Sequence, residues 1–353
     1  MKILVTGGAG FVGSHAAEYY AKRDCEVVVF DNLSRKRILG SSGDFSYNWD
    51  YLKKYDNIKL VSGDVNNFEL LSNLARDVDA IIHTAAQVAV TTSLSDPRTD
   101  FEINAVGTFN VLEAARTSKN GPAVLYCSTN KVYGNNVNKI PVKEEETRYS
   151  FDDEDFENGI AEDFTIDGTE HTPYGCSKLS GDIYVQDYGH RDEVDTGIFR
   201  MSCIYGTRQF GTEDQGWVVH FILSTLMGKS LTIYGDGKQV RDVLFVTDLI
   251  NVFDKFIENR DRYSGEVFNI GGGARNTLSL LELLDILEEL TGKRSSISFD
   301  DWRPSDQKVY ISDITKVQRL LGWKPRTGVE EGLELVVNWL EENRDFAPLL
   351  LKT

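Results

Sequence analysis

The sequence is poor in the residues that bind metals or form disulfides. It has four cysteines and five histidines in 353 residues. No two cysteines form a CxxC pair, and the histidines lack the spacing of metal ligands. Neither a zinc site nor a disulfide framework is therefore predicted, and no residue is assigned to a metal.

Long apolar runs are also missing. No stretch approaches the roughly 20 apolar residues that cross a bilayer. The apolar run Ile3-Leu4-Val5 directly after Met1-Lys2 is too short for a signal peptide. We therefore expect no membrane partner and a reduced, cytoplasmic location.

Positive charge is scarce, with 38 Lys and Arg against 55 Asp and Glu and a formal net charge of -17. This balance argues against a general affinity for nucleic acid or anionic membranes. An anionic small-molecule substrate is not excluded, because a local basic pocket can exist on an acidic protein. With 41% hydrophobic and 26% charged residues, the chain has the composition of a globular protein of about two domains.

The first half of the chain alternates short apolar runs with helical patterns, as βαβ units and parallel sheets do. The predicted strands are Lys2–Thr6, Glu26–Asp31, Ile58–Ser62, Ala80–Thr84, Ala123–Ser128 and Asp195–Arg200. The predicted helices between them are Phe11–Lys22, Phe68–Arg76, Val106–Thr117 and Tyr174–Gly189. Six strands with crossover helices predict an α/β fold with a Rossmann-like, doubly wound parallel sheet.

After about residue 200 the pattern changes to loops rich in Gly and aromatic residues. Helices are predicted there at Trp217–Met227, Leu278–Leu290 and Val329–Asn343. We predict a first domain over 1–200, with a return segment near 238–262, and a smaller substrate-binding region over 201–353. The acidic stretch Glu144–Glu170 is predicted to be a solvated surface insertion.

A glycine-rich turn joins the first strand to the first helix. Gly7 permits the tight turn, Gly10 lets the backbone approach a pyrophosphate, and Gly13 permits close helix–strand packing. The helix N-terminus, with Phe11 and Val12, supplies free N–H groups to the phosphates. In this strand–turn–helix context the glycines predict a dinucleotide site.

The second predicted strand ends at Asp31, about twenty residues further on. A carboxylate there accepts both ribose hydroxyls and repels a 2′-phosphate, which favours NAD over NADP. The basic residues Arg35, Lys36 and Arg37 weaken that preference, unless they are only a solvated cluster. Asp64-Val65, after the third strand, is placed to meet the adenine, although an Asp there is often only a cap.

The spacing Tyr174-x-x-x-Lys178 puts both side chains on one helix face. A phenol with a pKa near 10 is a poor base at neutral pH, and bringing it near 7 requires about 4 kcal/mol. A Lys178 cation is expected to lower the pKa of Tyr174, with help from the positive nicotinamide of NAD. With the Thr129 hydroxyl orienting the reacting oxygen, the three residues suit hydride transfer at a carbinol, with Tyr174 as general base and then acid.

These motifs resemble the extended short-chain dehydrogenase/reductase superfamily, which includes nucleotide-sugar epimerases and dehydratases. The matching positions run in order: Gly7–Gly13, Asp31, Ala85-Ala86-Gln87, Asn104, Thr129, Val132-Tyr133-Gly134, Tyr174, Lys178, Arg241-Asp242 and Arg303. The resemblance implies catalytic roles for Thr129, Tyr174 and Lys178. For the cofactor NAD it implies Gly7, Gly10, Phe11, Val12, Gly13, Asp31, Asn32, Ser34, Arg35, Asp64, Val65, Ala85, Ala86, Gln87, Asn104, Tyr174 and Lys178. For a nucleotide-sugar substrate it implies Val88, Thr129, Asn130, Lys131, Arg208, Gln209, Arg241 and Arg303, the last two as diphosphate ligands.

Within the superfamily, Asn130 and Lys131 stand where sugar 4,6-dehydratases typically have Asp and Glu. An amide and an ammonium do not readily serve as the acid and base of an elimination, so a dehydratase is disfavoured. The stretches Arg208-Gln209-Phe210 and Asp214–Trp217 resemble the CDP-sugar 2-epimerases that convert CDP-paratose to CDP-tyvelose. That resemblance implies inversion at C2 through a transient 2-keto sugar.

Other functions stay open at this point. They are a UDP-hexose 4-epimerase, another epimerase or oxidoreductase of the superfamily, and a catalytically silent nucleotide-binding protein. Two predicted helices, Val106–Thr117 and Tyr174–Gly189, resemble those that pair between subunits in the superfamily. A homodimer or homotetramer is therefore expected.

Overall fold

The computed structural model describes residues 1–35, 47–303 and 305–343, and its contacts define two compact units. Unit 1 contains Met1–Val132, Thr172–Arg200 and Ile250–Phe268, and unit 2 contains the rest. These bounds differ from the predicted division at residue 200. Residues 133–171 belong to unit 2, and the segment that returns to unit 1 is Ile250–Phe268, which overlaps the return segment predicted near 238–262.

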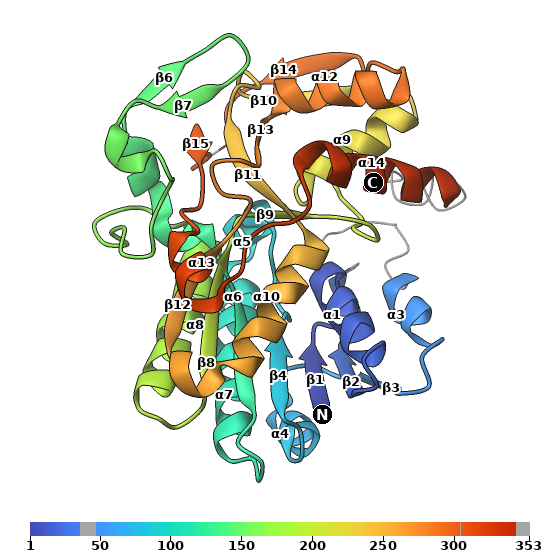
Figure 1. Ribbon diagram of the computed structural model, residues 1–353, viewed down its shortest axis with the longest axis vertical. Helices are drawn as coiled ribbons and strands as arrows, with labels where there is room; N and C mark the ends of the chain where they lie inside the picture. The colour runs from blue at the N-terminus through green and yellow to red at the C-terminus, as the bar shows by residue number, and fades with distance from the viewer. Residues whose placement is uncertain (36–46, 304, 344–353) are drawn as a thin grey trace. The chain divides into compact units, whose positions relative to one another are not determined.

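Unit 1 is built on a seven-stranded sheet in the order β3-β2-β1-β4-β5-β8-β12 (Figure 1). Its strands are β1 (Lys2–Thr6), β2 (Glu26–Asp31), β3 (Ile58–Ser62), β4 (Ala80–His83), β5 (Ala123–Thr129), β8 (Thr196–Met201) and β12 (Glu266–Ile270). From β3 to β5 each strand runs parallel to its neighbours. The predicted α/β fold is confirmed, and each predicted strand is correct to within one residue. The unpredicted strand, β12, joins the edge from far along the chain.

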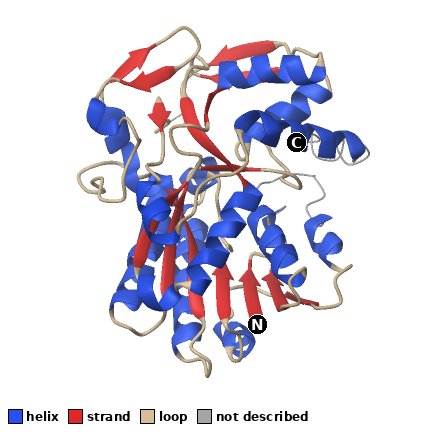
Figure 2. Cartoon of the chain, in the orientation of Figure 1, coloured by secondary structure: helices blue, strands red, loops and turns tan. Residues whose placement is uncertain are grey.

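Helices cover both faces of this sheet (Figure 2). They are α1 (Phe11–Ala21), α3 (Tyr47–Leu52), α4 (Phe68–Ala75), α5 (Val90–Ser95), α6 (Pro97–Phe101), the π-helical turn η1 (Glu102–Val106), α7 (Gly107–Arg116), α8 (Thr172–His190), α10 (Val246–Glu258) and α11 (Arg260–Tyr263). One group, α4, α7 and α8, packs together over a core that includes Leu71, Val111 and Val185. In the other group α1 packs on α3, and Tyr19 of α1 donates a 3.0 Å hydrogen bond to Asp254 of α10.

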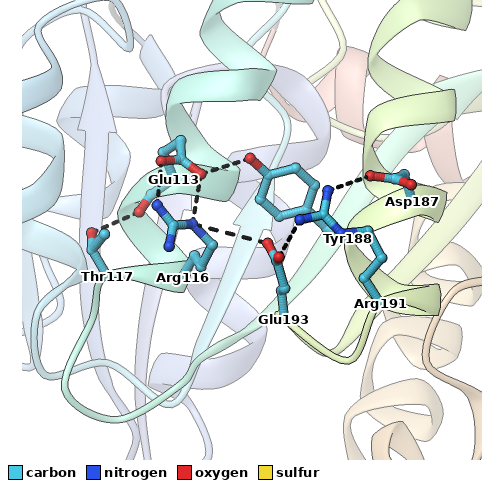
Figure 3. A network of polar contacts seen from close by, with 7 residues as sticks. All are labelled: Glu113, Arg116, Thr117, Asp187, Tyr188, Arg191 and Glu193. Atoms are coloured by element: carbon cyan, nitrogen blue, oxygen red, sulfur yellow. Dashed lines mark hydrogen bonds and ion pairs between the residues drawn. The ribbon is translucent and has the colours of Figure 1, made fainter.

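A polar network joins the far ends of α7 and α8 (Figure 3). The Glu113 carboxylate accepts hydrogen bonds from the Tyr188 hydroxyl at 2.6 Å and from Arg116 at 2.7 and 2.8 Å. Arg191, directly after the last residue of α8, pairs with Asp187 of that helix at 3.0 Å. The last turns of α8 are therefore tied to α7, while its first turns carry the predicted catalytic residues.

Among its described residues, unit 2 contains three smaller sheets. Its elements are η2 (Asn130–Lys139, whose first three residues lie in unit 1), β6 (Val142–Glu144), β7 (Tyr149–Phe151), η3 (Glu154–Phe156), β9 (Cys203–Tyr205), α9 (Trp217–Leu226), β10 (Leu231–Tyr234), β11 (Val240–Phe245), β13 (Thr277–Ser279), α12 (Leu280–Thr291), β14 (Ile297–Asp300), β15 (Val309–Tyr310), α13 (Thr315–Leu321) and α14 (Val329–Glu342). Strand β11 pairs in parallel with β9 and β15 and antiparallel with β13. Helix α12 begins two residues later than predicted, because Leu278 continues β13 and Ser279 caps the helix in a capping box with Glu282.

The acidic stretch Glu144–Glu170 lies in unit 2, where β6 and β7 form a hairpin. Most of its carboxylates are exposed, as predicted, but the segment is anchored. Ile160 is fully buried, and Glu162 accepts a 2.7 Å hydrogen bond from the Asn269 N–H. Within residues 1–35, 47–303 and 305–343, no helix is long and apolar enough to cross a membrane, and no three His, Cys, Asp or Glu side chains gather as a metal site.

Candidate active site

The glycine-rich turn has the backbone geometry expected of a dinucleotide site. Gly7 adopts φ +70°, and a Cβ on it would lie 2.5 Å from the Ala85 nitrogen. A Cβ on Gly13 would lie 2.5 Å from the Gly7 oxygen and 2.7 Å from Thr84 Oγ1. Gly10 is the extended N-cap of α1, so Phe11 and Val12 open the helix with unpaired N–H groups. Close packing therefore requires glycine at positions 7 and 13, as predicted.

Asp31, at the carboxyl end of β2, is hydrogen-bonded to the glycine-rich turn. One carboxylate oxygen accepts from the Ala9 N–H at 3.0 Å and the other from the Leu33 N–H at 2.8 Å. Burial raises the pKa of Asp31, while these two backbone hydrogen bonds lower it. Each oxygen keeps acceptor capacity, so the side chain fits a ribose diol.

The residues after β2 and β3 contact one another. Asn32 Nδ2 donates to Asp64 at 2.7 Å, and the Ser34 N–H donates to Asn32 at 3.0 Å. Asp64 also accepts a hydrogen bond from the Asn66 N–H at 2.9 Å, so it caps this turn. Val65 is buried in the core. Arg35 is described in the structure, whereas Lys36 and Arg37 lie outside the described residues.

The loop after β4 carries Ala85, Ala86, Gln87 and Val88, of which only Val88 is exposed. The Gln87 N–H donates to Asn104 Oδ1 at 2.9 Å, and Asn104 Nδ2 returns a 2.9 Å bond to the Gln87 carbonyl. Gln87 and Asn104 are almost completely buried. Their side chains therefore hold the loop in shape, and their direct contact with a cofactor stays a prediction.

Strand β5 ends at Thr129, next to Asn130 and Lys131. Thr129 Oγ1 donates to Asn130 Oδ1 at 3.3 Å and accepts from the Lys131 N–H at 3.3 Å. The Thr129 hydroxyl also lies close enough to the Tyr174 phenol to lower the pKa of Tyr174. The structure thus brings Thr129 and Tyr174 together as predicted.

The pKa of Tyr174 differs from the sequence-based expectation. The pKa of Tyr174 is raised to about 12, chiefly by burial and to a smaller extent by the Asp100 and Cys127 charges, against the lowering by Thr129. Lys178 Nζ lies 4.2 Å from the centre of the Tyr126 ring, and burial lowers the pKa of Lys178 to about 8. The protein's own groups therefore do not produce the lowered pKa that the Tyr174–Lys178 spacing predicted, because desolvation raises the pKa of Tyr174 by more than those groups lower it.

The predicted substrate residues of unit 2 are held by other protein groups. Arg241, on β11, donates to Asp306 at 2.6 Å. Arg303 pairs with Asp214 at 3.1 Å and lies 4.2 Å from the centre of the Tyr234 ring. Arg208 is buried, and Gln209 donates to the Ile204 carbonyl at 3.1 Å. Each candidate diphosphate ligand thus carries a carboxylate counter-ion within unit 2.

Three residues near Tyr174 and Lys178 were not predicted from the sequence to have a role in the site. Tyr126 lies under the Lys178 ammonium, Ser177 sits between Tyr174 and Lys178 in the chain, and Asp100 accepts a hydrogen bond from Ser177. Their signal in the sequence is weak, because a Ser and a Tyr beside a motif or an Asp in a short helix are common. Only the fold brings them together.

Comparison with known proteins supports one family. A model of the GDP-mannose 4,6 dehydratase family matches residues 4–336. The chain is 40% identical to a CDP-paratose 2-epimerase of Salmonella typhi, over 96% of this chain and 99% of that one. It is 31% identical to dTDP-glucose 4,6-dehydratase 1 of Escherichia coli K12, over 97% and 93%. A solved UDP-glucuronic acid 4-epimerase of Bacillus cereus, in complex with UDP-glucuronic acid and NAD, superposes with a TM-score of 0.81 at 29% identity, covering 97% of this chain and all of that one.

The glycine turn, the Thr129–Tyr174–Lys178 arrangement and these matches define the class. The chain belongs to the GDP-mannose 4,6 dehydratase family of the extended short-chain dehydrogenase/reductase superfamily. Its relatives in that family include both nucleotide-sugar epimerases and dehydratases.

Proposed function

We propose that this enzyme is an NAD-dependent epimerase that inverts C2 of a CDP-linked sugar, converting CDP-paratose to CDP-tyvelose. The observation that carries the chemistry is the pairing of Thr129 with Tyr174 beside two residues, Asn130 and Lys131, that lack carboxyl groups. The 40% identity to a CDP-paratose 2-epimerase supports the substrate.

The cofactor is NAD. The cradle formed by Gly7, Gly10 and Gly13 leaves no room for side chains at positions 7 and 13, and Asp31 presents its carboxylate at the end of β2. When bound, NAD would supply the hydride acceptor and donor of the reaction, and its oxidised form would add a positive charge to the site. A positive charge would favour the phenolate of Tyr174, which the protein's own groups together disfavour.

Tyr174 acts as the proton carrier. It takes the proton from the C2 hydroxyl as C2 is oxidised to a ketone, and it gives a proton back when C2 is reduced on the opposite face. Thr129 holds the reacting oxygen, and Lys178 supplies a buried positive charge on the same helix face. One tyrosine serves both half-reactions if the keto sugar turns between them. Deuterium incorporated at C2 from heavy water would instead indicate enolisation.

An elimination is disfavoured by the side chains beside Thr129. Asn130 is buried and its amide faces the Thr129 hydroxyl, so it offers no exchangeable proton of suitable pKa. The second candidate is a UDP-hexose 4-epimerase, which would use the same three catalytic residues. The solved UDP-glucuronic acid 4-epimerase, at 29% identity, is the observation that favours it.

The diphosphate ligands are Arg241 and Arg303. Each guanidinium is a planar fork that suits phosphate oxygens, and each is held in place by a carboxylate. A bound diphosphate would replace Asp306 as the partner of Arg241, or Asp214 as the partner of Arg303, so neither guanidinium would be left without an anionic partner. Arg208 and Gln209 are assigned to the same nucleotide.

The oligomer is a dimer built on α7 and α8. Four large apolar or aromatic side chains are exposed on α8, α7 and the adjoining α6, namely Phe101, Phe109, Ile183 and Tyr184. Rings of Phe109 and Tyr184 lie 5.6 Å apart, edge to face, which joins the two helices into one apolar surface. Sedimentation of the protein tests this, because Ile183→Lys is expected to give monomers.

The deciding experiment incubates the purified protein, without added NAD, with CDP-paratose, CDP-glucose and UDP-glucose in separate samples followed by NMR. Inversion at C2 of a CDP-sugar supports the proposal and shows that NAD is carried by the protein. Inversion at C4 of UDP-glucose would keep the catalytic residues but replace the substrate. A 4-keto-6-deoxy product would show that the enzyme is a dehydratase.

A further inference from the structure

The buried carboxylate of Asp100 is a hub of hydrogen bonds beside the catalytic helix. Its side chain, on α6, accepts from Ser177 Oγ at 2.5 Å, from Gln87 Nε2 at 2.8 Å and from Asn104 Nδ2 at 3.2 Å. Asp100 is 1% exposed. All three partners are donors, an arrangement that suits an ionised carboxylate.

These partners come from three separate parts of unit 1. Gln87 belongs to the loop after β4, Asn104 to the π-helical turn η1, and Ser177 to α8. Gln87 and Asn104 bind each other through two further bonds, and Asn104 Nδ2 also reaches Ser177 Oγ at 3.1 Å. The loop, the π-helical turn and α8 are therefore joined by one closed network with Asp100 at its centre.

The network acts on the turn of α8 that carries the catalytic pair. Ser177 lies three residues after Tyr174 and directly before Lys178. The helix start is held by a second contact, in which the Tyr174 N–H donates to Ser93 Oγ on α5 at 3.1 Å. A shift of Ser177 would move both catalytic side chains relative to the loop after β4.

We propose that Asp100 is a positioning residue for Tyr174 and Lys178, holding the first turns of α8 against the loop after β4 through Ser177, Gln87 and Asn104. The inference rests on the proposed function for the roles of Tyr174 and Lys178, but not on which sugar is inverted. Asp100 acts through protein groups, and the geometry gives it two effects, one of position and one of charge.

The charge effect follows from the ionisable groups around Tyr174 and Lys178. Both residues interact with Asp100, and Cys127 of β5 interacts with both of them. Asp182 lies one helical turn beyond Lys178, and Asp96, the N-cap residue of α6, interacts with Asp100. Asp100 raises the pKa of Lys178 against the lowering by burial. Without the carboxylate the pKa of Lys178 falls, so Lys178 loses its proton at a lower pH.

The test compares Asp100→Asn with Glu102→Gln, a matched loss of one carboxylate at an exposed position two residues away. We expect Asp100→Asn to keep its NAD content and lower kcat by about 10² -fold, since misplacement of about 1 Å can cost that much. Its activity should also decline at a lower pH on the alkaline side than that of the unsubstituted enzyme. Glu102→Gln should match the unsubstituted enzyme in both respects.

A second variant separates position from charge. Ser177→Ala removes the hydrogen bond between Asp100 and α8 but keeps the Asp100 carboxylate. We therefore expect kcat to fall while the alkaline limb of the pH–activity profile, where activity declines with rising pH, stays at the same pH. If Asp100→Asn does not fold, the test rests on Ser177→Ala. A kcat of Ser177→Ala equal to that of the unsubstituted enzyme would then overturn the proposal. A folded Asp100→Asn with unchanged kcat, or with a lower kcat and an unmoved alkaline limb, also overturns it.

The outcome does not depend on the substrate assignment. All variants are assayed on whichever nucleotide sugar the unsubstituted enzyme inverts. If CDP-paratose is not converted but another sugar is, the proposed substrate fails while the role of Asp100 is still tested.

Discussion

Arg200, on β8, donates two hydrogen bonds to the carboxylate of Asp182 on α8, from Nε and from Nη2, each at 3.1 Å. Both side chains are buried, and Ser128 Oγ adds a third bond to Asp182 at 2.5 Å. This pair fixes α8 to the sheet one helical turn beyond Lys178. Removing one member would leave a buried charge without its partner.

Arg200→Ala is therefore expected to lower the free energy of unfolding by about 3–5 kcal/mol. The control is Arg191→Ala, directly after the end of α8, where the ion pair with Asp187 is exposed to solvent and contributes little to stability. Urea unfolding of both variants measures the difference. Equal losses in the two variants would contradict the assignment of Arg200 as a buried anchor.

Replacing the phenol of Tyr174, the proposed proton carrier, separates an enzyme from a catalytically silent nucleotide-binding protein. Tyr174→Phe should keep its NAD and lose turnover by about 10²–10⁴-fold, because the proton carrier is gone. Tyr188→Phe is the matched control, since it removes a hydroxyl from the same helix that bonds only to Glu113 in Figure 3. Turnover of Tyr174→Phe at the rate of Tyr188→Phe would exclude the proposed role.

A buried histidine makes the protein sensitive to acid. His83 hydrogen-bonds Thr6 at 2.7 Å and Thr108 at 3.0 Å, and burial lowers its pKa from 6.5 to about 3. Between those values the unfolded chain binds a proton that the folded chain does not, so stability falls as the pH falls from 6.5 towards 3.

From pH 6.5 to pH 5, the His83 contribution should cost the unsubstituted protein about 2 kcal/mol that His83→Gln does not lose. The measurement is urea unfolding at both pH values for His83→Gln and for His190→Gln, whose histidine is exposed. The His190 variant should follow the unsubstituted protein. Parallel pH curves for all three proteins would show that His83 accepts a proton in the folded state.

The glycine at position 13 is expected to be irreplaceable. In Gly13→Ala the new methyl group would lie 2.5 Å from the Gly7 oxygen, so the turn must shift, at a cost of about 1–3 kcal/mol. NAD content should fall with it, because the same turn forms the cradle. Gly328→Ala, where a Cβ would meet no atom within 4 Å, is the control for both readouts. Full NAD content in purified Gly13→Ala would show that the cradle tolerates the shift.

The local features of the site were predictable from the sequence. The glycine turn, the end of β2 at Asp31 and the Tyr174–Lys178 helix face follow from spacing and periodicity within one or two elements. Such patterns depend on neighbours in the chain, and the predicted strands of unit 1 are accordingly correct to within one residue.

The network around Asp100 was not predictable in the same way. Asp100 and Ser177 are 77 residues apart, and neither residue type signals a contact with the other. The same holds for β12, which joins β8 at the edge of the sheet, and for residues 133–171, which pack with unit 2.

Short-range spacing in the sequence is enough to specify the class of fold, the dinucleotide turn and the side chains proposed to be catalytic. The environment of those side chains depends on the tertiary fold. Burial raises the pKa of Tyr174 and lowers that of Lys178, and burial depends on residues brought together from distant parts of the chain.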